Sequence, residues 1–164
     1  MSLIQVTFAD GSVHDIASGV SAGEALAGAE GKGAVAAVID GVERDLATEL
    51  SASCTLSGIQ AASEAGLHIL RHSCSHLLAQ AVTELHPEAR PTIGPAIEHG
   101  FYYDFHMDPI GEEELRAITK RMKQLVKENL AVVREEHTGD SLREMFSHNP
   151  FKLELMDDKL EDGA

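Results

Sequence analysis

The chain has 164 residues, of which 43% are hydrophobic, and a formal net charge of −14. This length allows one ordinary domain or two small ones. So acidic a surface disfavours free-standing nucleic-acid binding, so any RNA contact must be local or be carried by another part of a larger protein. The sequence contains no apolar run of about 18 residues, the length needed to span a membrane. The N-terminus lacks a signal-peptide pattern, and Cys54 and Cys74 fit a reducing cytosol, so we expect a cytoplasmic protein.

The first 60 residues carry the signals of a small sheet covered by one helix. Strands are predicted at residues 3–8, 12–17, 34–39 and 54–60. Asp10-Gly11 and Asp40-Gly41 indicate hairpin turns. Ser21 and Glu24 form a capping-box pattern, which predicts a helix from there to about Gly28.

This order predicts an α+β, ubiquitin-like β-grasp domain over residues 1–61, with one helix on one face of a mixed sheet. His14 lies beside a turn and is interpreted as a surface residue rather than a ligand. Gly31-Lys32-Gly33 breaks the chain, but it lacks the glycine–lysine–serine pattern of a phosphate loop. Residues 61–64 are interpreted as a short linker.

The remaining residues show helical and extended patterns in turn. We predict helices at 65–86, 112–129 and 151–160, a constrained loop at 90–100, strands at 101–105 and 130–136, and a short helix opened by a second capping-box pattern at Ser141 and Glu144. The apolar face of the first helix comprises Leu67, Leu70, Cys74, Leu77, Leu78, Ala81 and Leu85. That of the second comprises Leu115, Ile118, Met122, Leu125 and Val126.

Two histidines, His72 and His76, share one face of the first of these helices. Residues four apart are separated by about 40° around the axis and about 6 Å along it, so both imidazoles can reach one metal ion or one substrate. The spacing alone is weak evidence, because most such pairs are surface polar residues. His68 lies about 12 Å along the axis from His76 and cannot join the same ion. Cys74 points elsewhere and is interpreted as a small buried apolar residue.

Two further motifs carry a family resemblance. RHSCSHLLAQAV at residues 71–82 and TIGPAIEHGFYYDF at 92–105, behind a β-grasp domain, closely resemble the N-terminal region of the threonyl-tRNA synthetases. In that family a TGS domain precedes an editing domain, which hydrolyses serine wrongly attached to the threonine tRNA. The resemblance covers nearly the whole chain and implies a TGS domain at 1–61 and the start of an editing domain at 65–164. The editing motifs are the specific part, because some GTPases and stringent-response enzymes also carry TGS domains.

The resemblance also assigns individual residues. By position in the motifs, His72 and His76 match the paired editing-site histidines, Tyr103 matches a tyrosine that lines the substrate pocket, and Lys152 matches an editing lysine. His68 has no counterpart. The family completes its site with a later Cys-x-x-x-His motif and adds aminoacylation and anticodon-binding domains, none of which occurs in these 164 residues, so we expect a fragment or a truncated product.

Editing is needed because serine differs from threonine by one methyl group, which a binding pocket discriminates by only about 10- to 200-fold. Hydrolysis of the aminoacyl ester requires activated water and donors for the developing oxyanion. A neutral imidazole of His72 or His76 can orient or deprotonate water near pH 7. Lys152 can position water or protonate the departing ribose oxygen, and Tyr103 can bind the substrate or shape the pocket. The structural alternatives are that Lys152 is only a solvated charge and that Tyr103 is only a core residue.

The resemblance leaves the cofactor open. Catalytic zinc usually has three protein ligands, so zinc at His72 and His76 would need the later Cys-x-x-x-His motif, while histidines acting without metal fit the sequence equally well. ATP and a further zinc are expected only with the aminoacylation domain.

The implied partners are the threonine tRNA and, through the aminoacylation domain, a second subunit. No membrane partner is expected. The alternatives are a non-catalytic TGS-type interaction module and a stand-alone aminoacyl-tRNA hydrolase.

Overall fold

The computed structural model describes residues 2–29, 33–133 and 135–161. The chain divides into two compact units, Met1–Leu70 and Arg71–Ala164. Helices occur together with a mixed sheet and antiparallel strand pairs, so the predicted α+β class is confirmed. Among the described residues, no helix is both long and apolar enough to cross a membrane. The predicted chain break at Lys32 lies outside the described residues.

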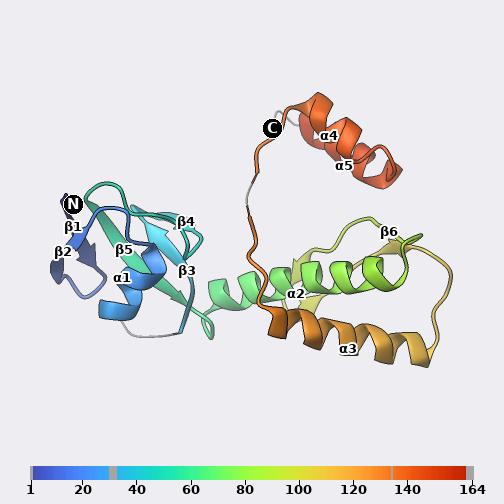
Figure 1. Ribbon diagram of the computed structural model, residues 1–164, viewed down its shortest axis with the longest axis horizontal. Coiled ribbons are helices and arrows are strands. Elements are labelled where there is room, and N and C mark those ends of the chain that lie inside the picture. Colours follow the sequence, from blue (N-terminus) through green and yellow to red (C-terminus); the bar gives the residue numbers. More distant parts are fainter. Residues whose placement is uncertain (1, 30–32, 134, 162–164) are drawn as a thin grey trace. The chain divides into compact units, whose positions relative to one another are not determined.

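The first unit is built on a five-stranded mixed sheet with the strand order β2-β1-β5-β3-β4 (Figure 1). Its strands are β1 (Leu3–Phe8), β2 (Val13–Ala17), β3 (Ala34–Ile39), β4 (Val42–Arg44) and β5 (Cys54–Gln60). β1 runs parallel to β5, and the other neighbours are antiparallel. Asp40 and Gly41 both have positive φ, 48° and 80°, as a tight turn between two such strands requires. The four predicted strands are all present.

One helix, α1 (Ala22–Ala29), covers a face of this sheet (Figure 1). Alternate residues of β1 point toward α1, because successive side chains of a strand face opposite sides. The core they form comprises Ile4, Val6, Phe8, Ala22, Ala25, Leu26, Ala37, Leu50 and Leu56. Ser21 caps the helix as predicted: the Glu24 amide donates to its Oγ at 3.3 Å, and its own amide donates to Glu24 Oε2 at 3.1 Å. The predicted helix over a mixed sheet is therefore confirmed.

We expect Ser21→Ala to lower the free energy of unfolding by about 1 kcal/mol, the usual cost of removing a serine N-cap. The Glu24 amide then loses its acceptor at the start of α1. The midpoint of urea unfolding, followed by circular dichroism, measures the change. Ser51→Ala is the control, because the exposed Ser51 offers only its backbone carbonyl to Ser18. Equal midpoints for the two variants would contradict the prediction.

The second unit contains most of the helices. Its elements are α2 (Glu64–Leu85, which begins in the first unit), β6 (Arg90–Pro91), β7 (Ala96–Ile97), β8 (Gly100–Phe101), β9 (Phe105–His106), α3 (Glu112–Glu128), α4 (Gly139–Met145) and α5 (Pro150–Glu161). α2 and α3 lie side by side (Figure 1). Ala81 and Val82 pack with Ile118 and Leu125 between them. Arg121 on α3 also donates to Glu84 on α2.

Of the two strands predicted in this unit, the first is wrong in extent and the second is absent from the described residues. The stretch 101–105 is divided between β8 and β9. Between them, Asp104 exchanges backbone hydrogen bonds with Thr92 and Ile93 without forming a strand. The described residues of 130–136 form no strand, and Val132 is 94% exposed. A strand needs a partner, and no described strand pairs with this segment.

The helix predictions need smaller corrections. α4 begins at Gly139, and its cap is Thr138, whose side chain accepts from the Ser141 amide, rather than Ser141 itself. On α3, Leu115 and Val126 are 53% and 65% exposed, so the buried face is narrower than predicted. On α2, the residues Leu67, Leu70 and Leu85 of the predicted apolar face are exposed. Cys74 is only partly buried, and His14 is exposed as predicted.

Candidate functional site

His72 and His76 contact each other on α2. Their Nε2 atoms are 3.0 Å apart, and their rings meet edge to face with centroids 4.5 Å apart. A hydrogen bond at this distance requires one Nε2 to donate and the other to accept. The accepting imidazole of the pair is therefore neutral in this arrangement, because its Nε2 carries the lone pair that accepts the bond.

The environment of His76 favours its neutral form. Its pKa is lowered, first by partial burial, then by the neighbouring His72, and then by the positive charge of Lys152. Each of these effects disfavours a second positive charge at the ring. His76 is thus a base in its unprotonated form at neutral pH.

Ser75 connects the histidine helix to the loop that follows it. Its side chain is fully buried, and its Oγ lies 2.7 Å from the carbonyl oxygen of His72 and 2.9 Å from that of Gly94. The hydroxyl can donate to either carbonyl, which holds the loop against α2. We did not predict a role for Ser75 from the sequence. The available signal was a serine inside a helix, which often bonds a carbonyl of the preceding turn.

Tyr103 packs directly over Gly94. A Cβ on Gly94 would lie 2.1 Å from a carbon of the tyrosine ring, so this position admits only glycine while the ring stays where it is. The Tyr103 ring also stacks on Phe105, with centroids 4.8 Å apart and an interplanar angle of 25°. The glycine of the Ile-Gly-Pro motif and the tyrosine of the FYYD motif therefore form one packed wall.

Lys152 reaches the same wall from α5. Its Nζ donates to the Thr92 carbonyl at 2.9 Å and lies 6.0 Å from the centroid of the Tyr103 ring. The side chain is partly buried, and its charge acts on His76. The structure thus brings His72, His76, Tyr103 and Lys152 into one region of the second unit. The exposed His68 belongs to the part of α2 in the first unit.

Asn149 holds α5 in place, and we did not predict it from the sequence. Its side chain is 2% exposed. The amide nitrogen donates to the Pro91 carbonyl at 2.9 Å, and the amide oxygen accepts from the backbone amides of Phe151 and Lys152 at 3.2 and 3.4 Å. The sequence signal was asparagine before proline, since asparagine is a preferred N-cap and proline a preferred first helical residue.

Comparison with known proteins gives the chain a family context. No protein-family model matches it. It is 43% identical over 162 residues to threonine–tRNA ligase from Thermobifida fusca, which is 98% of this chain and 24% of that protein. The predicted resemblance is confirmed. Threonine–tRNA ligase from Streptococcus gordonii is 39% identical over 165 residues, covering 98% of this chain and 26% of that ligase. The chain therefore spans about a quarter of the length of these curated relatives.

The described residues of this threonine–tRNA ligase homologue do not complete a zinc site. They contain no group of three or more His, Cys, Asp or Glu side chains that could hold one metal ion. His72 and His76 supply two of the three protein ligands that catalytic zinc usually takes, and their Nε2 atoms lie 3.0 Å apart. In either case, with metal or without it, the imidazoles can take part in acid–base chemistry.

Lys152→Gln is expected to raise the pKa of His76, because it removes a nearby positive charge that lowers that pKa. The measurement is a pH titration of the imidazole carbon-bound protons by NMR, with His76→Ala used to assign the resonance. Lys159→Gln is the matched control, since it removes an exposed charge from the same helix. An unchanged His76 titration in Lys152→Gln would show that Lys152 does not act on the histidine.

Proposed function

We propose that the second unit is the beginning of an editing domain, which hydrolyses seryl-tRNA(Thr) as part of a threonine–tRNA ligase. The observation that carries the proposal is the convergence of His72, His76, Tyr103 and Lys152 in one unit of a chain related to threonine–tRNA ligases. We further propose that residues 1–61 are a TGS domain. The mixed five-stranded sheet with one covering helix supports this part of the proposal.

The activities of the longer protein belong to the same proposal. By homology we assign it ATP-dependent attachment of threonine to tRNA in the cytoplasm, with the threonine tRNA and a second subunit as partners. The relatives that support this assignment are about four times as long as this chain. The reaction assigned to the present residues is hydrolysis of the seryl ester only.

In the proposed reaction, His76 removes a proton from water while the water oxygen forms a bond to the ester carbonyl carbon. His76 suits this role because its lowered pKa keeps it neutral near pH 7. With the Nε2–H of His76 donating to Nε2 of His72, His72 fixes the tautomer of His76 that carries its lone pair on Nδ1, the atom that takes the proton from water. The ester bond then breaks, the proton passes to the departing ribose oxygen, and free serine and the uncharged tRNA are released.

Lys152 and Tyr103 contribute the other face of the proposed site. A lysine ammonium has three donors, and one of those on Lys152 is used by the Thr92 carbonyl. The other two remain for the developing oxyanion or the departing oxygen, where a fixed positive charge stabilises the transition state. The Tyr103 ring, held by Gly94 and Phe105, forms the wall against which the seryl group lies.

The test is a chimera in which this chain replaces the matching segment of the Thermobifida fusca ligase. We expect the chimera to release serine from preformed seryl-tRNA(Thr) well above the spontaneous rate and to leave threonyl-tRNA(Thr) largely intact. Aminoacylation by the same chimera reports that it is folded. A chimera that aminoacylates normally but releases serine at the spontaneous rate would favour the non-catalytic module. Equally fast release by the 164-residue chain alone would favour the stand-alone hydrolase.

A further inference from the structure

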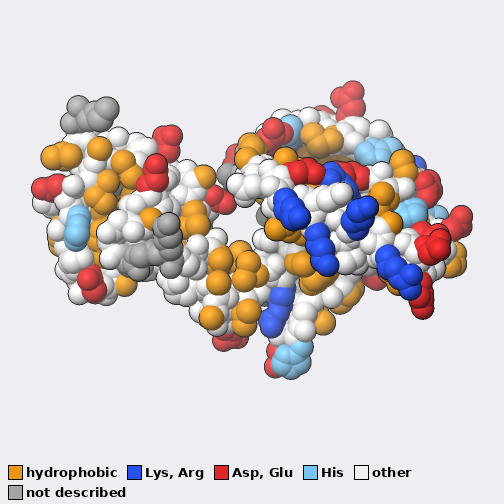
Figure 2. Space-filling view, turned by 60° about the horizontal axis from the view of Figure 1, so that its bottom comes forward, with side chains coloured by type: hydrophobic (Ala, Val, Ile, Leu, Met, Phe, Trp, Pro, Cys, Tyr) orange, Lys and Arg blue, Asp and Glu red, His pale blue; other side chains and the backbone are white. Residues whose placement is uncertain are grey.

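The helix α3 carries a concentration of positive charge in an acidic protein. Five of the 13 Lys and Arg residues of the chain lie within its 17 residues, although the net charge of the chain is −14. Four of them recur at helical spacing: Arg116, Lys120, Lys123 and Lys127. Figure 2 shows Lys and Arg side chains gathered on one face of the molecule. We call Arg116, Lys120, Lys123 and Lys127 the basic stripe.

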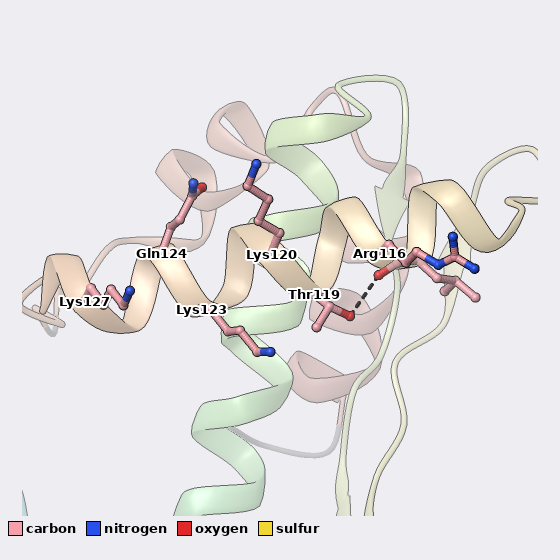
Figure 3. Close-up of a pocket in the computed structure, with 7 residues that line it drawn as sticks. Arg116, Thr119, Lys120, Lys123, Gln124 and Lys127 are labelled. Carbon is pink, nitrogen blue, oxygen red and sulfur yellow. Dashed lines mark hydrogen bonds between the residues drawn. The ribbon is translucent and has the colours of Figure 1, made fainter.

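The stripe lies opposite the buried face of α3. At 100° per residue its four members fall within about 60° of one another, roughly half a turn from Ile118 and Leu125. Ile118 and Leu125 are buried, with 4% and 3% exposure, against α2. The stripe therefore projects away from the core, and Figure 3 shows its side chains spread along the free side of the helix.

Most of this charge is not neutralised within the protein. Arg116 is paired with Glu112 at 2.8 Å, but Lys120, Lys123 and Lys127 form no ion pair with the part of the chain that the structure describes. By contrast, Arg121 on the core side of α3 bonds both Glu84 and Glu128. Thus, on the described helix α3, Lys120, Lys123 and Lys127 are left available to an external anion.

The stripe borders a shallow groove of about 540 Å³, which Leu115, Thr119 and Gln124 also line. The groove follows α3 from residue 115 to residue 127, about 18 Å along the helix axis. An anion that engages every cation of the stripe must therefore be extended and carry regularly spaced charges. A small anion such as free phosphate would meet only one or two of them.

We propose that the basic stripe binds the phosphate backbone of an RNA stem, and that this stem belongs to the tRNA whose ester the editing site hydrolyses. An RNA strand supplies the extended row of negative charge that the stripe requires, and the matching relatives are tRNA ligases. The stripe is a local exception to the acidity that disfavours RNA binding elsewhere. The identity of the stem as tRNA rests on the proposed function, whereas backbone binding does not.

The test compares two double variants with equal loss of charge, Lys120→Gln with Lys123→Gln, and Arg44→Gln with Lys159→Gln. All four side chains are exposed. Binding of a short, unacylated RNA hairpin to the full 164-residue chain is measured by fluorescence anisotropy between about 50 and 200 mM salt. With phosphate contacts from the three unpaired lysines of the stripe, Lys120, Lys123 and Lys127, the affinity of the wild-type chain should fall about 40-fold over this range. The affinity of the stripe variant, with one contact left, should fall only about 4-fold over the same range. At low salt this variant should already bind more weakly than the wild type. The control should follow the wild type.

Three results would overturn the proposal. Equal weakening in both double variants would mean that binding depends on net charge rather than on the stripe. Competition by phosphatidylserine vesicles at lower concentrations than by RNA would assign the stripe to a membrane surface. Salt-sensitive dimerisation that only the stripe variant loses, with RNA binding unchanged, would assign it to a second copy of the chain. Because the hairpin carries no ester, its binding is measured independently of hydrolysis, so failure of the editing proposal leaves this test intact.

Discussion

His76→Ala is expected to slow the release of serine from seryl-tRNA(Thr) by about 10²- to 10⁴-fold in the chimeric ligase, the range that a positioned acid or base contributes. The threonine-charging rate should stay unchanged, since we assign that activity to the remainder of the longer protein. His72→Ala should also slow the release, because it removes the partner that fixes the His76 tautomer. Single-turnover hydrolysis of preformed seryl-tRNA(Thr) measures both.

The pH profile gives the same prediction a second readout. A general base must be unprotonated, and the pKa of His76 is lowered from its ordinary value of 6.5. The rate of the wild-type chimera should therefore decline only as the pH falls through this lowered pKa, which is at a lower pH than for a histidine with the ordinary value. His68→Ala is the control from the same helix and should keep both rate and profile. Undiminished hydrolysis in the double variant His72→Ala with His76→Ala would remove the catalytic proposal.

The parts of the fold that the sequence predicts well are those determined by near neighbours. The Asp40-Gly41 turn needs two adjacent residues that tolerate positive φ. The cap of α1 needs Ser21 and Glu24, which are three residues apart. A strand depends on a distant partner as well as on its own residues, which is why the apolar stretch after α3 looked like a strand. In the structure Val132 and Val133 are 94% and 73% exposed, and none of the described strands pairs with them.

The candidate site also has parts that the local sequence predicts and parts that it does not. The approach of His72 and His76 follows from helical geometry alone, and the structure places their Nε2 atoms 3.0 Å apart. The family motifs name Tyr103 and Lys152 but not what holds them. Ser75 bonds a carbonyl 19 positions along the chain, and Lys152 bonds one 60 positions away. Such contacts depend on how α2, the loop and α5 pack together, and no local pattern encodes that packing.

Asn149 is a buried side chain that bonds the Pro91 carbonyl, 58 positions away along the chain. We expect its replacement to have the largest effect on stability. Asn149→Ala leaves the Pro91 carbonyl without its donor, at a cost of about 1–3 kcal/mol, and removes the cap of α5, at about 1 kcal/mol. We therefore expect the free energy of unfolding to fall by about 2–4 kcal/mol. Urea unfolding of the full chain, followed by circular dichroism, measures it.

Asn149→Ser separates the two functions of this side chain. A serine hydroxyl can accept from the first amides of α5 and restore the cap, but it is too short to reach the Pro91 carbonyl in place of the asparagine amide. We expect Asn149→Ser to recover about 1 kcal/mol relative to Asn149→Ala. The remaining loss measures the link between α5 and β6, which a cap alone does not supply.

The same two variants test whether Asn149 positions Lys152 for the site. If the link to Pro91 holds α5 against β6, its loss should move the Lys152 ammonium away from His76. The pKa of His76 should then rise in both Asn149→Ala and Asn149→Ser, as in Lys152→Gln, because a charge that lowers it has been withdrawn. A purely structural role would reduce stability but leave the His76 titration unchanged. That result would mean that the bond from Lys152 to the Thr92 carbonyl is sufficient to hold the lysine in place.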